Sequence, residues 1–227
     1  MSQTSPTSAG LDITWVQGQS PRLLLWVDGI GGYLVCLGSR VTLGQVNPET
    51  TPDISLLADI SRHHATIERD AEAYTLSAIR KVSVNGQTVE RCLLRDGDRL
   101  TLGVSCQLVF GQPARLSASA RVNVVSGHRL AQPVEGVLLM ADTLVLGAGP
   151  QSHVSIEELE KPVVLFRHDK GIGVRHEGRL KVDGEVAQER ALIHPGQRVS
   201  AGGVTFTFEA FSPGAGWHAF AGPGKGR

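Results

Sequence analysis

The sequence predicts an all-β protein made of two β-sandwiches in tandem. Short runs rich in Val, Leu, Thr and Ile alternate with clusters of Gly, Pro, Asp and Asn, which is typical of strands joined by turns. No long segment carries a helical period with caps. The length of 227 residues exceeds the roughly 100 to 150 residues of one typical domain and suits two.

The expected strands of the first half follow one another at short spacing. They cover residues 11–16, 23–27, 33–37, 41–43, 65–69, 74–77, 99–102 and 107–110. Asn85-Gly86 lies between apolar flanks and predicts a two-residue hairpin turn, because both residues tolerate a positive φ. Asp96-Gly97-Asp98 predicts a turn that leads into the strand at 99–102. Antiparallel strands of this kind favour a sandwich.

The second half repeats the first in the same order. The segments 41–44, 84–86 and 94–100 correspond to 144–147, 182–184 and 193–199. We therefore expect two related sandwiches at 10–112 and 119–211, joined by a linker at 113–118. Residues 1–9 are predicted to be a disordered leader, and the Gly-rich residues 212–227 a disordered tail.

Composition narrows the classes of partner. The 22 basic and 22 acidic residues cancel, so no whole-chain field favours nucleic acid or an anionic membrane. The apolar run at residues 23–27, which no other run exceeds in length, is far short of the roughly 20 residues that span a bilayer, and the N-terminus lacks the pattern of a secretory signal. The three cysteines show no disulfide or zinc spacing, which favours reduced, buried thiols in a cytoplasmic protein.

Catalytic and metal chemistry find little support in the motifs. Ser61 with His63 or His64 suggests a hydrolase pair, but the chain has no Gly-x-Ser-x-Gly elbow. The histidines lack a His-Glu-x-x-His spacing. Gly29-Ile30-Gly31-Gly32 lacks the Lys-Ser or Lys-Thr of a phosphate loop. We expect no catalytic residue, no metal and no cofactor.

The stretch 59–67, which holds Ser61 and His64 as Ser-x-x-His, is followed by Asn85-Gly86 and by 94–103. Together these segments resemble the core of a forkhead-associated (FHA) domain. The resemblance implies a β-sandwich that binds phosphothreonine peptides through loops at one end. It also implies that Ser61 contacts phosphate and that His64, Gly44, Asn85 and Gly86 form the scaffold of the site.

Two family positions differ in this chain. At the family's Gly-Arg pair this chain has Gly44-Gln45. The neutral side-chain amide of Gln45 thus replaces an arginine, whose charge-assisted hydrogen bond to phosphate is worth roughly 1.5 to 3 kcal/mol. The family's first Asn-Gly turn is missing, and an ungapped count places Arg80 there, beside Lys81. One hypothesis is that Arg80, Lys81 and Arg62 replace the lost cation. The other is that Arg80 and Lys81 are an ordinary solvated charge pair.

The second half lacks the recognition residues altogether. Gly147 is followed by Ala148, and counting along the sequence matches Glu160 to Ser61 and Val163 to His64. A glutamate at that position repels a phosphate dianion. We therefore expect the second sandwich to be a scaffold or a different protein-binding surface.

These observations predict a non-catalytic adaptor whose first sandwich binds phosphothreonine proteins, such as a serine/threonine kinase or its substrate. The alternative is a phosphate-independent scaffold that uses both sandwiches for protein contacts or self-association.

Overall fold

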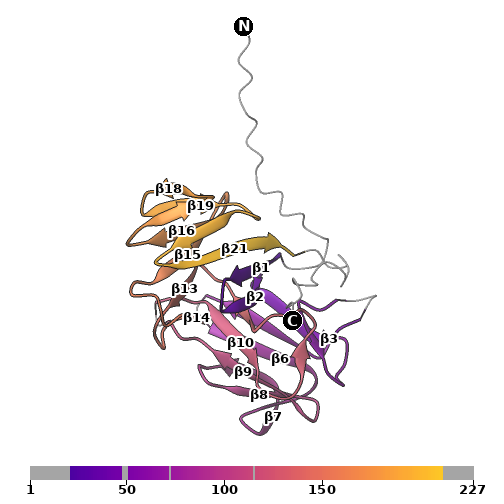
Figure 1. The fold of residues 1–227 in the computed structure, drawn as a ribbon. Helices are drawn as coiled ribbons and strands as arrows, with labels where there is room; N and C mark the ends of the chain where they lie inside the picture. The colour runs from indigo at the N-terminus through magenta and orange to yellow at the C-terminus, as the bar shows by residue number, and fades with distance from the viewer. Residues whose placement is uncertain (1–20, 48–50, 72, 115, 212–227) are drawn as a thin grey trace.

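The computed structural model describes residues 21–47, 51–71, 73–114 and 116–211. Within these ranges every regular element is a β-strand, which confirms the predicted all-β class. The leader at 1–9, the expected strand at 11–16 and the tail at 212–227 lie outside the described residues. The first half forms one lobe and most of the second half forms the other, with β1 and β2 between them (Figure 1).

The strands of the first half are β1 (Arg22–Val27), β2 (Gly31–Cys36), β3 (Arg40–Gln45), β4 (Ile54–Leu57), β5 (Ala65–Asp70), β6 (Ala73–Val84), β7 (Gln87–Leu94), β8 (Arg99–Leu102) and β9 (Cys106–Gly111). Those of the second half are β10 (Ala120–Val124), β11 (Arg129–Leu130), β12 (Gly136–Leu139), β13 (Thr143–Gly147), β14 (Val154–Ser155), β15 (Val163–His168), β16 (Gly171–His176), β17 (Leu180–Val182), β18 (Glu185–Ala187), β19 (Arg190–Ile193), β20 (Arg198–Ala201) and β21 (Val204–Ala210).

The first hydrophobic core lies between two layers of strands that β6 connects. The N-terminal half of β6 pairs with β5, and its C-terminal half pairs with β8. The register with β7 shifts between Ser77 and Val82, where β6 crosses from one layer to the other. Alternation along the strands supplies the buried side chains. Leu43, Ile67 and Phe110 are among the largest of these.

The second core is built in the same way. The sheet β14-β13-β15-β16-β19 forms one layer, and β1, β21, β20 and β17 belong to the layer opposite. Leu146 and Leu165 come from the first layer, and Leu25, Phe206 and Phe208 from the second. Each half of the molecule is therefore a sandwich around its own apolar core.

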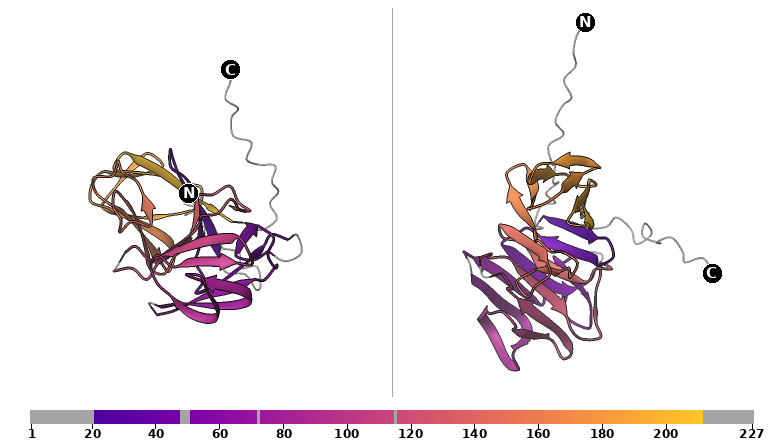
Figure 2. Two further views of the ribbon diagram at one scale, coloured as in Figure 1. Left: turned by 90° about the horizontal axis from the view of Figure 1, so that it is seen from below. Right: turned by 60° about the vertical axis from the view of Figure 1, so that its left-hand side comes forward.

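The two sandwiches exchange their first strands. β1 pairs with β21, so that Leu25 lies opposite Phe208, and β10 pairs with β9. Between them β2 and β12 run parallel, and their side chains alternate between the cores: Leu34 enters the first and Val35 the second. One sheet thus continues from half to half (Figure 2). The domain boundaries at 10–112 and 119–211 stay a prediction, which truncation can test.

Matching turns support the predicted internal repeat. Asn85-Gly86 forms a two-residue hairpin with φ of 51° and 83°, as predicted, and Asp183-Gly184 forms its counterpart with φ of 50° and 87°. The Asn85 side chain accepts a hydrogen bond from the Arg99 amide at 3.0 Å, and that of Asp183 accepts one from the Arg198 amide at 2.8 Å. The two turns thus brace the starts of β8 and β20, which come later in the chain.

The strand register corrects one expected equivalence by a single residue. Leu43 pairs with Ala65 in the first half, and Leu146 pairs with Val163 in the second. Val163 is therefore equivalent to Ala65, and Pro162 to His64. Leu159, however, lies against Gly202 as Ile60 lies against the equivalent Gly103, so Glu160 keeps the Ser61 position and the loop of the second half is one residue shorter. Sequence counting missed this because loop lengths do not report register.

Candidate functional site

The Ser61 loop connects β4 to β5 and lies directly on the end of β3. A Cβ atom added to Gly44 would stand 1.8 Å from the Arg62 carbonyl oxygen, so only glycine allows this approach. The Gln45 amide donates to the Ser61 carbonyl at 3.0 Å, and the His64 amide donates to the Leu43 carbonyl at 2.8 Å. Three residues of β3 thus hold both ends of the loop.

His64 ties this loop to two other segments. Its imidazole is 3% exposed, and Nδ1 accepts a hydrogen bond from the Ser61 amide at 3.2 Å. In the neutral ring the proton is then on Nε2, which donates to the Lys81 carbonyl at 2.9 Å. The Gly103 amide is 3.1 Å from Nε2, but a protonated nitrogen accepts nothing, so this amide donates to the Lys81 carbonyl at 3.0 Å.

The corner of β6 brings Arg80 and Lys81 next to this loop. The His64 carbonyl accepts hydrogen bonds from the Ile79 and Arg80 amides, both at 3.0 Å. Arg62, Arg80 and Lys81 are exposed, and Ser61 is half-buried. The Arg80 guanidinium donates to the Ile79 carbonyl at 3.3 Å. The structure therefore brings the backbones together, while convergence of the three cations on the Ser61 hydroxyl stays a prediction.

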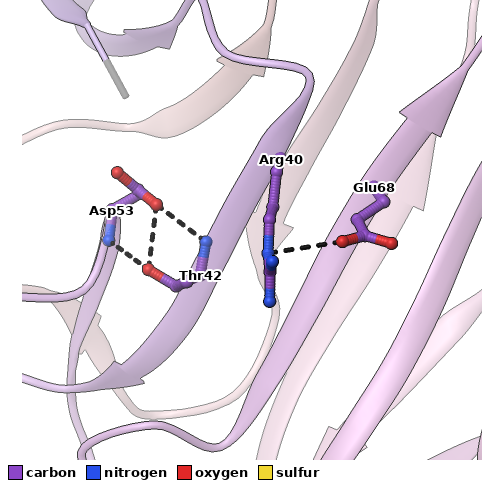
Figure 3. Close-up of polar contacts among 4 residues, drawn as sticks. All are labelled: Arg40, Thr42, Asp53 and Glu68. Carbon is purple, nitrogen blue, oxygen red and sulfur yellow. Dashed lines mark hydrogen bonds and ion pairs between the residues drawn. The ribbon is translucent and has the colours of Figure 1, made fainter. Parts of the chain in front are cut away.

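Thr42 and Asp53, which the sequence reasoning missed, join β3 to the residues that lead into β4. The Asp53 carboxylate accepts hydrogen bonds from the Thr42 amide at 2.8 Å and from the Thr42 hydroxyl at 2.9 Å (Figure 3). The Asp53 amide donates back to the Thr42 hydroxyl at 3.0 Å. Arg22 of β1 donates to the Asp53 carbonyl at 3.0 Å. The Pro52-Asp53 pair ahead of a strand was the only local signal for this anchor.

The Asn85-Gly86 turn braces a neighbouring turn. The Asn85 amide group donates to the Asp98 carboxylate at 2.8 Å, and the second Asp98 oxygen accepts from the Arg95 amide at 2.7 Å. These bonds tie the β6–β7 hairpin to the turn that precedes β8.

In the second half a different residue supplies the imidazole. Pro162 stands at the His64 position, and His176 pairs with Val163 from the neighbouring strand β16. The His176 ring lies against Gly202, just as the His64 ring lies against Gly103, the equivalent glycine. The ring is thus retained from another strand, without the Ser-x-x-His loop.

These features define a β-sandwich whose serine-bearing loop is held at one end by a buried imidazole. Residues 41–103 match the family model of the FHA domain. The chain therefore contains an FHA domain, and FHA domains are interaction modules. The match does not extend to the second half, whose membership of the family stays a prediction. No curated protein matches the chain.

Several solved structures are similar to part of the chain. The FHA-2 domain of the Mycobacterium tuberculosis ABC transporter Rv1747 is 28% identical, with 39% of this chain and 76% of that one covered and a TM-score of 0.31. An FHA domain of an Arabidopsis thaliana hypothetical protein is 21% identical, with 55% and 97% covered and a TM-score of 0.31. Mycobacterium tuberculosis EmbR, in complex with a low-affinity phosphopeptide, is 26% identical, with 40% and 24% covered and a TM-score of 0.27.

Other features of the described residues bear on the remaining expectations. Cys36 and Cys106 are buried as expected, whereas Cys92 is only half-buried. Within the described ranges, no group of three or more His, Cys, Asp or Glu side chains is arranged to hold a metal ion. The same ranges contain no helix with the length and apolar character needed to cross a membrane.

Proposed function

We propose that this chain is a non-catalytic cytoplasmic adaptor whose FHA domain binds proteins phosphorylated on threonine, such as a serine/threonine kinase or its substrate. The phosphate group would contact the Ser61 hydroxyl and the side chains of Arg62, Arg80 and Lys81. The observation that carries the proposal is the double link through His64: its ring bonds the Ser61 amide and the Lys81 carbonyl, and its own carbonyl bonds the Arg80 amide.

This link holds the backbones of Arg62, Arg80 and Lys81 close to the Ser61 loop. Arg62 belongs to the Ser61 loop, and Arg80 and Lys81 belong to the corner that is bonded to that loop. All three side chains are exposed, so each can turn toward a phosphate without a large desolvation cost. A phosphate bound by two such cations gains charge-assisted hydrogen bonds, which are about twice as strong as neutral ones. This gain offsets the arginine that Gln45 replaces.

The direct test is a titration of the full chain with a phosphothreonine peptide library, with the unphosphorylated peptides as control. We expect phosphate-dependent binding that weakens roughly tenfold in Ser61→Ala and in Arg80→Ala, since each loses a hydrogen bond to a charged group. Arg190→Ala serves as the matched control, because Arg190 is an exposed arginine on the second sandwich. Equal binding of both peptide sets would refute the proposal.

The alternative is a phosphate-independent scaffold, and Gln45 is the observation that favours it. Two strands carry exposed apolar residues: Leu93 of β7 is 63% exposed and Val186 of β18 is 67% exposed. A partner could contact these residues without a phosphate group. Binding of a partner with equal affinity before and after phosphatase treatment would support this alternative.

A further inference from the structure

The second sandwich has a sheet face that points away from both cores. It is formed by β13, β15, β16 and β19, whose register aligns residues in rows across the four strands (Figure 1). Leu144, Leu165 and Val174 point into the second core, so the residues next to them along each strand point outward. One outward row is Val145, Val164, Arg175 and Arg190, and the other is Thr143, Phe166, Gly173 and Leu192. These two rows are called the outer face.

The centre of the outer face is apolar. Val145, Val164 and Phe166 are half-buried and belong to neither core, and Leu192 is 38% exposed. The Phe166 ring lies against the backbone of β16, because a Cβ atom added to Gly173 would stand 2.1 Å from it. Apolar side chains from three strands thus remain on the outside of the sandwich.

The equivalent face of the first sandwich is polar. Leu43 pairs with Ala65 as Leu146 pairs with Val163, so the register aligns the two faces residue by residue. Thr42, Thr66, Glu68, Thr75 and Ser77 occupy the positions of Val145, Val164, Phe166, Gly173 and Arg175. The first sandwich therefore forms without apolar side chains on this face. Contiguous apolar surface with a polar border is typical of an interaction site.

Positive charge borders the apolar centre. Arg175 and Arg190 are exposed and are direct partners in the register of β16 and β19. Like charges directly opposite each other destabilise a sheet. Glu177 pairs with Arg175 at 3.6 Å, whereas among the described residues no carboxylate forms an ion pair with Arg190. Neither outward row contains an acidic residue, so the outer face carries an excess of positive charge.

We propose that the outer face is a docking surface for a segment of a partner protein in which apolar side chains are flanked by glutamate or aspartate. The apolar side chains of this segment would cover Val164 and Phe166. Its carboxylates would form charge-assisted hydrogen bonds with Arg175 and Arg190 and would offset the repulsion between them. This contact needs no phosphate group and lies on the sandwich that lacks the Ser-x-x-His loop, so it goes beyond phosphothreonine binding.

The test is a titration of the full chain with unphosphorylated peptides that contain Leu residues flanked by Glu, followed by amide NMR signals. We expect the signals of Val164, Phe166 and Arg175 to move. The same peptides with Lys in place of Glu should bind about tenfold more weakly or worse, since they lose hydrogen bonds between charged groups.

Variants that copy the first sandwich test the residues of the outer face. Val164→Thr and Arg175→Ser install the residues of the equivalent positions Thr66 and Ser77, and Arg175→Ser should weaken binding of the Glu peptides about tenfold. Arg91→Ala is the matched control, because Arg91 is exposed and stands at the position equivalent to Arg190. It should change the Kd by less than about twofold, as exposed charges away from a site usually do.

Two further variants separate this surface from the phosphothreonine site. Arg190→Ala should weaken the Glu peptides and leave phosphate-dependent binding unchanged, and Ser61→Ala should do the reverse. Equal binding of the Glu and Lys peptides, or the absence of shifts in β15 and β16, would overturn the proposal. Shifts of these signals that depend only on protein concentration would assign the outer face to a second copy of the chain and would also overturn it. The shifts are measured in the unchanged protein, so a variant that fails to fold leaves this decision possible.

Discussion

Gly44 is glycine for a steric reason: the Ser61–Arg62 backbone crosses directly over it. We predict that Gly44→Ala displaces this loop, because the new Cβ would stand 1.8 Å from the Arg62 carbonyl oxygen. Forced overpacking typically costs about 1 to 3 kcal/mol. Urea unfolding should show a loss of this size, and phosphopeptide binding should fall. Gly149→Ala is the control, since nothing lies within 4 Å of its Cβ position, and an equal loss in the control would contradict this reason.

Gln45 permits a gain-of-function prediction. Gln45→Arg restores the arginine that the family places after the glycine at position 44. The main-chain amide of residue 45 already donates to the Ser61 carbonyl at 3.0 Å, so the new side chain would start beside the Ser61 loop. A charge-assisted fork to phosphate should then strengthen phosphothreonine peptide binding about tenfold or more. Isothermal titration with the best library peptide measures the change. Gln45→Lys distinguishes the fork from charge alone, and unchanged affinity in both variants would place the phosphate elsewhere.

His153 predicts a pH dependence of stability. Its side chain is 2% exposed; Nδ1 accepts a hydrogen bond from the Val145 amide at 3.0 Å, and Nε2 donates to the Ser119 carbonyl at 3.2 Å. Burial lowers the pKa of His153 from 6.5 to about 4, although the bond to Ser119 opposes this shift. The folded state therefore binds fewer protons than the unfolded state between these two values. The free energy of unfolding should fall by about 3 kcal/mol as the pH drops from 6.5 to 4.

Urea unfolding across this pH range checks the His153 prediction. His153→Gln keeps one acceptor and one donor but cannot titrate, so its stability curve should lose this component of the slope. His168→Gln is the control, because His168 is exposed. If His153→Gln and the unchanged protein lose stability in parallel, His153 is not the group responsible.

Among the elements, the two equivalent hairpins are braced by the same kind of hydrogen bond, but the amide and the carboxylate have exchanged places. In the first half the amide of Asn85 donates to the carboxylate of Asp98 at 2.8 Å. In the second half the amide of Gln197 donates to the carboxylate of Asp183 at 2.9 Å. Each pair contains one amide and one carboxylate, but on opposite turns. The amide and the carboxylate are therefore interchangeable only when both are exchanged together.

This exchange predicts a measurable coupling. Asn85→Asp alone sets two carboxylates against each other and should destabilise the protein. Adding Asp98→Gln recreates the pair of the second half and should recover most of the loss. Contacting residues of this kind typically couple by about 0.5 to 3 kcal/mol. A double-mutant cycle by urea unfolding measures the coupling, with Gln107, exposed on β9, as the site of a control Gln107→Asn change. Additive effects of the two changes would show that the pairs are independent.

For the whole molecule, the exchanged strands predict that neither half is stable alone. A fragment of residues 1–112 lacks β10 and β12, which place Ala120, Val122, Val137 and Leu139 in the first core. It would also expose the edge of β9 and leave β1 without β21. We expect this fragment to give poorly dispersed NMR spectra and to regain native signals when mixed with residues 113–227. A lone fragment with the unfolding midpoint of the full chain would instead establish the boundary at 112 as a true domain limit.

Much of the local structure was accessible from the sequence. Alternating apolar residues predicted most strands of the first half, and Asn85-Gly86 predicted its hairpin, because both signals depend on neighbouring residues. The Ser61 to His64 motif located the loop. The anchor between Thr42 and Asp53 was missed because it depends on the path of a connection and not on a local pattern.

The arrangement of the halves required the tertiary structure. A period of two specifies which face of a strand is buried, but it does not specify which strand lies alongside. The pairing of β1 with β21, the imidazole supplied by His176 instead of position 162, and the hydrogen bond from Arg167 to the Leu37 carbonyl all depend on residues that no local pattern connects. The amino-acid pattern thus accounts for the strands and the family, whereas long-range pairing sets the partners of those strands and the side chains that meet between them.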